Sequence, residues 1–202
     1  MSKDVLRTWV RLLAPFTPHL CEEIWREMLG ERDFISKSSY PAPDAALIDR
    51  EAELAEELVQ NTLRDIEEIL RLKKVKPGKV ILYTSQAWKT TVFRQALDLR
   101  SGVEMKTLMG RLMSDPEIKK YAKEVPKFVQ KISGDIQGMS EYLIDSIRSA
   151  SLDELASLNE AKEFMSREIG CPFEVWSADS AGYDPQGKSK FAAPLRPAIY
   201  IE

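Results

Sequence analysis

One histidine and two glutamates stand close together near the start of this 202-residue sequence, in the stretch PHLCEE at positions 18–23. An imidazole beside carboxylates can form a metal site or a general acid–base pair. The sequence holds no second histidine, and helical spacing puts Glu22 and Glu23 on different faces of a helix. A proline followed by early acidic residues is instead typical of a helix start. We therefore favour a structural role for His19 over a catalytic or metal-binding one.

Lysines recur every four residues in the middle of the chain, at positions 119, 123, 127 and 131. Basic groups at this spacing can follow the phosphate backbone of a nucleic acid. Pro126 interrupts the stripe, because proline breaks or kinks a helix, so we expect two shorter basic stretches on either side of it. An ordinary solvated helix surface explains the lysines equally well. The candidate RNA-binding residues in this region are Lys119, Lys120, Lys123 and Lys127.

Aromatic and basic residues interleave near the end of the sequence, in the turn-rich stretch DSAGYDPQGKSKFAAPLRP and the final AIYIE. Loops of this kind suit unstacked RNA bases, whereas the A-form major groove excludes side chains. Glu202 can accept hydrogen bonds from amino groups on base edges. The alternative is that residues 199–201 only complete a sheet and that Glu202 is disordered. The candidates here are Tyr183, Lys188, Lys190, Phe191, Arg196, Tyr200, Ile201 and Glu202.

Positive charge is concentrated in one part of the chain. Residues 71–131 carry 15 basic and 5 acidic side chains, whereas residues 1–70 carry 8 and 15, and residues 132–202 carry 6 and 12. A central basic block of this kind can meet a polyanion. The overall net charge of -3 and the pI of about 5.5 argue against indiscriminate nucleic-acid binding.

Composition also excludes several classes of protein. No apolar run approaches the roughly 18 residues that a membrane span needs, and the first residues lack the apolar core and cleavage site of a signal peptide. Cys21 and Cys171 are far apart and form no C-x-x-C pair, so we predict buried free thiols rather than a disulfide framework or a zinc site. We expect a cytoplasmic protein with neither a membrane nor a DNA partner.

The first part of the chain has the pattern of a helical bundle. Hydrophobic spacing predicts helices over residues 3–13 and 18–29, and a long amphipathic helix from Ala45, capped by Asp44, to about Lys74. A stripe of that length is buried only in a bundle. At KPGKVILYTS the hydrophobic period changes from about 3.6 to 2, which predicts a strand over residues 80–84 and the start of a new domain.

Further helices are predicted over residues 88–99, 104–113, from 115 onward and 152–169, with strands at PFEVWSA and AIYIE. Ser114 with Glu117, and Ser151 with Glu154, have the spacing of capping boxes. Trp88, one turn into its helix, is more typical of a core residue than of a base-stacking one. The predicted fold class is α+β: a partial helical bundle over residues 1–76, then a small α+β domain with a short mixed sheet over residues 77–202.

Several stretches resemble one family of enzymes. LLAPFTPHLCEEIW resembles the signature segment of the helical anticodon-binding domain of the class I aminoacyl-tRNA synthetases for leucine, isoleucine, valine and methionine. DFISKSSYP resembles the extended segment that follows it, and the helix from Ala45 resembles their next bundle helix. The region after residue 76, with its ending KSKFAAPLRPAIYIE, resembles the C-terminal domain of archaeal-type leucyl-tRNA synthetases. The resemblance covers essentially the whole chain.

The resemblance implies a C-terminal portion of a longer enzyme, because nothing in the chain resembles the H-I-G-H or K-M-S-K-S elements of the catalytic domain or an editing domain. The parent enzyme uses ATP and Mg²⁺ to attach leucine to its tRNA, whereas this portion is expected to hold no cofactor and no metal and to be inactive alone. Its implied partners are the rest of the synthetase chain and leucine tRNA, whose long variable arm the C-terminal domain is associated with reading.

Two other classes of function stay open. The region from residue 77 can be an interaction or oligomerisation module appended to the synthetase, in which case lysines should surround an exposed apolar patch. An independent enzyme is the weakest interpretation, because the sequence contains no evident nucleophile–base pair, metal-ligand set or phosphate loop.

Overall fold

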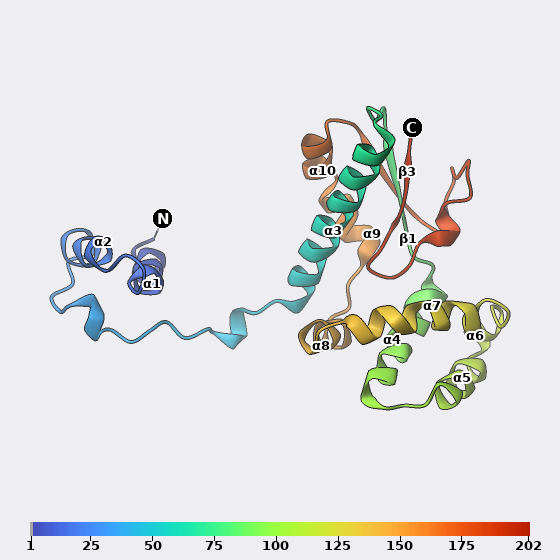
Figure 1. The fold of residues 1–202 in the computed structure, drawn as a ribbon, viewed down its shortest axis with the longest axis horizontal. Coiled ribbons are helices and arrows are strands. Elements are labelled where there is room, and N and C mark those ends of the chain that lie inside the picture. Colours follow the sequence, from blue (N-terminus) through green and yellow to red (C-terminus); the bar gives the residue numbers. More distant parts are fainter. Residues whose placement is uncertain (1) are drawn as a thin grey trace. The chain divides into compact units, whose positions relative to one another are not determined.

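A computed structural model describes residues 2–202. The chain divides into two compact units, one extending to Ile48 and one running from Asp49 to Glu202. In the described residues, the first unit is helical, and the second combines helices with a three-stranded sheet (Figure 1). The predicted α+β fold class is confirmed.

The first unit contains α1 (Lys3–Leu13) and α2 (Pro18–Glu23), and α2 continues as a π-helical turn over Ile24–Met28. The predicted helices over 3–13 and 18–29 are therefore confirmed, apart from the wider last turn. Their facing sides form a small core that excludes water and holds the unit together. Its buried members are Val10, Cys21, Trp25, Leu29 and Ile35.

The glutamates of the PHLCEE motif have different surroundings. Glu22 Oε2 accepts a hydrogen bond of 2.9 Å from the backbone N–H of Ile35, and Trp25 Nε1 donates one of 3.0 Å to the carbonyl oxygen of Asp33. These two bonds fasten the irregular segment after α2 onto the helix. Glu23 and His19 are exposed. Glu22 thus has a structural role in this unit.

The long helix starts later than the sequence pattern predicts. Asp44 caps only a short 3₁₀ turn over Ala45–Leu47, and α3 runs over Arg50–Lys73 with Asp49 accepting from the N–H groups of Glu51 and Ala52. Ile48 and Asp49 have extended backbone dihedrals, so the helical pattern is interrupted there. Aspartate favours an N-cap because its carboxylate satisfies N–H groups that have no partner inside the helix.

Helix α3 packs within the second unit, which differs from the predicted domain boundary near residue 76. Its buried stripe contacts α8, α9 and α10 and covers one face of the sheet (Figure 1). A sheet face of apolar side chains needs such a cover, so α3 and the sheet form one core. The shared core contains Leu58, Val59, Leu63 and Ile66 of α3 with Val80, Leu82, Leu158, Met165 and Phe173.

The sheet has the strand order β2-β1-β3. The central strand β1 (Val80–Thr84) pairs in parallel with β2 (Phe173–Ser177) and antiparallel with β3 (Ala198–Ile201). All three predicted strands are confirmed. Ile81 and Tyr83 point to the opposite face from Val80 and Leu82, where they cluster with Trp176 and Ala192. The loop between β2 and β3 lies over that second face.

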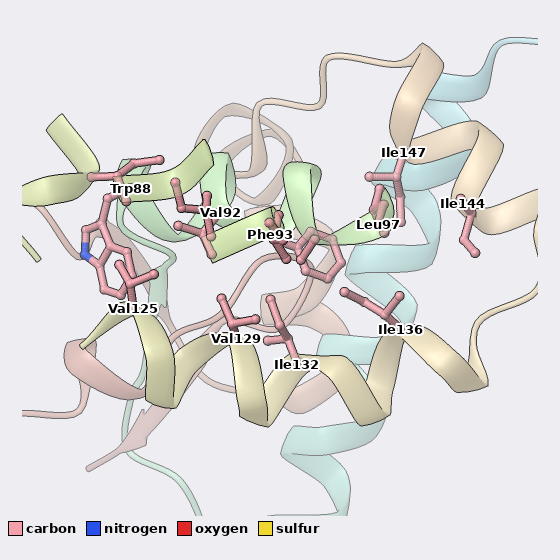
Figure 2. Packing of buried hydrophobic residues seen from close by; sticks show 14 of the residues in the cluster. Trp88, Val92, Phe93, Leu97, Val125, Val129, Ile132, Ile136, Ile144 and Ile147 are labelled. Atoms are coloured by element: carbon pink, nitrogen blue, oxygen red, sulfur yellow. The ribbon is translucent and has the colours of Figure 1, made fainter. Parts of the chain in front are cut away.

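A helical subdomain follows β1. It contains α4 (Ala87–Ala96), α5 (Met105–Ser114), α6 (Pro116–Lys119), α7 (Val125–Gly138) and α8 (Glu141–Ser149), and the chain returns to the sheet through α9 (Glu154–Glu160) and α10 (Lys162–Ile169). Figure 2 shows the buried side chains of α4 facing those of α7. Trp88 is 6% exposed, so its predicted place in the core is confirmed.

Aspartates, rather than the predicted serines, start two of these helices. Asp115 accepts from the N–H of Glu117, and Asp153 accepts from the N–H of Ala156. The proposed capping boxes at Ser114 and Ser151 are therefore wrong, because an aspartate further along the chain takes the extended cap conformation. The predicted helix over 152–169 is also divided, since α9 and α10 meet at Ala161.

Candidate nucleic-acid interface

The lysines of α6, α7 and their connection lie on the surface. Pro126 occupies the first turn of α7, where its missing N–H costs nothing, so the lysines are divided between two elements, as predicted. Lys120 Nζ lies 2.7 Å from the Glu117 carboxylate. Within residues 2–202, no carboxylate oxygen lies within 4.0 Å of the ammonium groups of the four other lysines. They are Lys119, Lys123, Lys127 and Lys131.

Helix α7 presents its lysines outward because its other side is anchored. Val125, Val129, Ile132 and Ile136 recur at helical spacing and are buried against α4 and its neighbours (Figure 2). Burial of each such side chain contributes roughly 1.5–3 kcal/mol. Lys127 and Lys131 thus stand on an anchored helix rather than on a loop.

A buried lysine connects this support to the segment before β3. Lys89 of α4 is 6% exposed, and its ammonium donates hydrogen bonds to the carbonyl oxygens of Lys190 at 2.6 Å and of Ala192 at 2.8 Å. It also lies 5.9 Å from the centre of the Phe128 ring on α7. Burial lowers the pKa of Lys89, and the positive charge of Lys131 lowers it further.

The loop before β3 is ordered by one carboxylate. Asp184 accepts hydrogen bonds from the backbone N–H groups of Lys188 at 2.7 Å and Ser189 at 3.0 Å. Burial acts to raise the pKa of Asp184, but the hydrogen bonds from Ser189, Lys188 and Gly187 outweigh it and lower that pKa. Lys188 is half-buried.

Phe191 offers the most open aromatic ring of this loop. It is 61% exposed, and Lys190 Nζ lies 5.1 Å from the ring centre. A cation beside an exposed ring is the combination that binds a phosphate and stacks on its base. Lys190 and Phe191 therefore form a suitable pair for unstacked RNA.

The last residues of the sequence are held firmly. Glu202 exchanges backbone hydrogen bonds with Lys79, and its carbonyl oxygen also accepts from the N–H of Gly78 at 2.7 Å. Tyr183 Oη donates a bond of 2.7 Å to Glu202 Oε1, while Tyr83 Oη donates one of 2.7 Å to the carbonyl oxygen of Tyr183. The residues before Glu202 do complete the sheet, as the structural alternative predicts, but Glu202 is not disordered.

Strand β3 distributes the remaining candidates between two faces of the sheet. Tyr200 is half-buried on the face beneath the loop, opposite Ile81. Ile201 is half-buried on the other face, against the core shared with α3. Arg196 also lies on the α3 side, where its Nε is 3.8 Å from Asp65 Oδ2. The structure does not bring Ile201 and Arg196 to the surface that carries Lys190.

The candidates therefore form two groups at opposite ends of β1. Glu202 lies beside Lys79, just before β1 begins, whereas Lys89 follows the strand's carboxyl end. Five residues of strand span roughly 13 Å at about 3.3 Å per residue. The loop of residues 183–192 joins the groups, since Tyr183 contacts Glu202 and the other end of the loop contacts Lys89.

The candidates chosen from the sequence lack Lys89 and Asp184. Lys89 acts through carbonyl groups more than 100 residues away, whereas Asp184 binds N–H groups only four and five residues further along the chain. Lys89 carried a usable signal: it precedes Val92 and Phe93 by three and four residues, which places it on the buried side of α4. A lysine on such a face must find partners. The sequence around Lys89 does not indicate that its partners are the carbonyl oxygens of residues 190 and 192.

The residues that the structure describes offer neither a metal-binding cluster nor a membrane-spanning helix. Residues 2–202 contain no group of three or more histidine, cysteine, aspartate or glutamate side chains placed to hold a metal ion. None of the helices in this range is both long enough and apolar enough to cross a membrane. Cys21 and Cys171 are buried free thiols, as predicted.

Comparison with known proteins agrees with the sequence motifs. A family model described as the anticodon-binding domain of tRNA ligase matches residues 1–82. The chain is 53% identical over 200 residues to the leucine–tRNA ligase of Methanosarcina acetivorans, covering 98% of this chain and 21% of that protein. It is 39% identical over 206 residues to that of Pyrococcus horikoshii, covering 100% and 20%. The chain is therefore similar, along nearly its whole length, to one part of archaeal leucine–tRNA ligases.

More distant members align just as completely. The leucine–tRNA ligase of Methanocaldococcus jannaschii is 34% identical over 200 residues, covering 99% of this chain and 19% of that protein. The chain thus spans about a fifth of the length of the leucine–tRNA ligases that it matches. The anticodon-binding model ends inside β1, so the candidate interface lies beyond it but within the aligned leucine–tRNA ligase region.

Proposed function

We propose that this chain binds leucine tRNA as part of a leucine–tRNA ligase. The observation that carries the proposal is the set of lysines on α6, α7 and their connection that have no carboxylate partner within residues 2–202. Lys89 joins this part of the chain to the exposed pair Lys190 and Phe191. Ammonium groups that are not neutralised within the protein can each release a counterion from a phosphate. The family match supplies the class of RNA, since the relatives are named as leucine–tRNA ligases.

The finer proposal concerns the long variable arm of leucine tRNA. Phe191 supplies an exposed ring for an unpaired base, and Glu202 supplies a carboxylate held in place by Tyr183. Within residues 2–202, Glu202 Oε2 makes no hydrogen bond. That oxygen can accept a hydrogen bond from the amino group of a base. An acidic residue can thus contribute specificity for a base, whereas the lysines contribute attraction to the phosphate backbone.

The other partners follow from the same family. We propose that the chain works in the cytoplasm with the rest of a synthetase chain, and that ATP and Mg²⁺ serve leucine activation in that larger enzyme. We assign no step of the ligase reaction to residues 2–202. Their contribution is to position the tRNA.

The experiment is a binding series with three RNAs across a range of salt concentrations. The RNAs are leucine tRNA, the same tRNA with its variable arm shortened, and a naturally short-armed tRNA. We expect affinity to fall with rising salt for all three and to be highest for the intact leucine tRNA. Equal affinity for all three would contradict variable-arm recognition. Absence of binding at low salt would contradict RNA binding altogether and favour a protein-facing module.

Two pairs of variants sharpen the test. K123A/K127A removes two exposed lysines of the proposed surface, and R64A/R167A removes two exposed arginines from α3 and α10 as a matched control. The first pair should weaken the binding of every RNA and reduce the slope of log affinity against log salt concentration by about one to two units. The control pair should leave both nearly unchanged. Deleting residues 201–202 should reduce the preference for the long arm while leaving the salt slope nearly unchanged.

A further inference from the structure

We propose that Lys89 is a positioning residue for RNA binding, which clamps the loop of residues 188–192 against α7 so that both carry one continuous basic surface. The inference rests on the proposed RNA-binding function and deepens it. Lys89 itself is buried and reaches no phosphate. It acts through Lys188, Lys190 and Phe191.

The hydrogen bonds of Lys89 support a clamp rather than a simple space-filling role. Its ammonium holds two carbonyl oxygens, of Lys190 and Ala192, from more than 100 residues away in sequence. Charged donors give shorter and stronger hydrogen bonds than neutral ones. A methionine fills similar space without burying a charge, so the distinctive contribution of the ammonium is its directional bonds to the loop.

The contacts of Lys89 join three elements that are far apart in the sequence: α4, α7 and the loop before β3. The Lys89 ammonium lies 5.9 Å from the centre of the Phe128 ring on α7 and donates hydrogen bonds to two carbonyl oxygens of the loop. The carbonyl groups that Lys89 holds therefore lie near Phe128, in the first turn of α7. Within residues 2–202, the other hydrogen bonds of the backbone around Lys188 and Lys190 are those to Asp184 and to neighbouring loop residues, while Ala192 is buried in the cluster beneath the loop.

The same helix provides a matched control. Arg94 of α4 also donates to a distant backbone carbonyl, with its Nη2 2.7 Å from the oxygen of Ala150. That bond joins α4 to the segment before α9 and does not touch the loop. K89M and R94M thus each remove one cation that holds a carbonyl, and only K89M is expected to affect the RNA surface.

The first measurement is hydrogen exchange of the free 202-residue chain. The backbone N–H of Phe191 donates a hydrogen bond to the carbonyl oxygen of Lys188, and the N–H of Ala192 donates one to that of Ser189. K89M should speed their exchange by about tenfold or more, while R94M should leave it at the wild-type rate. Unchanged exchange in K89M would overturn the clamp, and this result does not depend on whether the chain binds RNA.

The second measurement is a double-mutant cycle with a leucine tRNA transcript. K89M should weaken binding by about three- to tenfold, and R94M by less than about twofold. In a K188A/K190A/F191A background, adding K89M should change affinity by less than about twofold, because the residues through which Lys89 acts are already gone. A full additional loss there would show that Lys89 acts by another route and would overturn the proposal.

The outcomes separate this inference from the proposed function. If the wild type binds no RNA, the proposed function fails, whatever the exchange data show. If K188A/K190A weakens binding and K89M does not, the function stands and the positioning role of Lys89 fails. Should K89M not fold, K89Q replaces it in both measurements, because its amide keeps two N–H donors on a side chain one bond shorter than that of lysine; its expected effects are the same in direction and smaller.

Discussion

Tyr183 Oη lies 2.7 Å from Glu202 Oε1 and donates a hydrogen bond to it, so a loop residue fixes the side chain of the final residue in the sequence. Tyr183 is itself held, because its carbonyl oxygen accepts from Tyr83 Oη in the central strand. The carboxylate that we propose for base recognition is therefore positioned by a chain of two tyrosines. Its geometry does not depend on a free tail.

The hydrogen bond between Tyr183 and Glu202 should change the pKa measured for the Tyr183 hydroxyl. The hydrogen bond to Glu202 raises the pKa of Tyr183 to about 12 from the ordinary 10.0. Because the folded-state pKa is the higher one, its stabilising contribution is intact below pH 10 and is lost as pH rises toward 12. E202Q should return the pKa of Tyr183 toward its ordinary value. The check is the tyrosinate absorbance difference between each protein and its Y183F variant; an unchanged titration in E202Q would contradict the bond.

Glu154 gives a second pH-dependent prediction, at acidic pH. Its Oε1 accepts from the N–H of Leu195 at 2.7 Å, and its buried Oε2 has no partner in the described residues. Burial raises the pKa of Glu154, so the folded state holds the proton more tightly than the unfolded state. This group's stability contribution should therefore fall as pH rises from the ordinary glutamate range, near 4.3, through the raised value.

The substitution E154Q should abolish that part of the pH dependence, because the amide does not titrate. Each unit by which the pKa is raised corresponds to about 1.4 kcal/mol. The measurement is urea unfolding across acidic to neutral pH, with E160Q at the exposed end of α9 as the matched control. The idea fails if E154Q and E160Q show the same slope of unfolding free energy against pH.

Gly134 in the middle of α7 predicts a stabilising substitution. A Cβ added there meets no heavy atom within 4 Å, and alanine is better than glycine inside a helix by roughly 0.5–1 kcal/mol. G134A should raise the free energy of unfolding by about that amount. G102A is the contrasting variant, because Gly102 has a φ of 85° that alanine adopts only with strain. Denaturant unfolding should show a higher free energy of unfolding than the wild type for G134A and a lower one for G102A.

The packing of α3 on the sheet predicts where the chain can be shortened without loss of the fold of the second unit. A chain of residues 49–202 should unfold cooperatively, because it keeps α3 on the sheet. A chain of residues 77–202 loses buried Leu58, Leu63 and Ile66, each worth roughly 1.5–3 kcal/mol. Such a loss removes much of the 5–15 kcal/mol typical of a folded protein. Circular dichroism during urea titration distinguishes the two; equal stability would contradict the assignment of α3 to this unit.

Much of the local structure could be predicted from the sequence. The alternating pattern around Val80 and the helical pattern of residues 3–13 have strong periods, and these depend only on neighbouring residues. Helix starts were less predictable, because Asp49 competes with Asp44, and Asp153 with Ser151, for the same cap role. The PHLCEE motif carried the family resemblance although none of its residues is assigned chemistry.

The sequence by itself determined the helix and strand periods, the segregation of basic charge and the family resemblance. Only the tertiary structure decided that α3 covers the sheet, that Lys89 reaches the carbonyl of Lys190, and that Ile201 and Tyr200 lie on opposite faces. The physical reason is that periodicity shows which side of an element is buried but not against what. Partners 100 residues apart are chosen when apolar faces and buried polar groups are satisfied together.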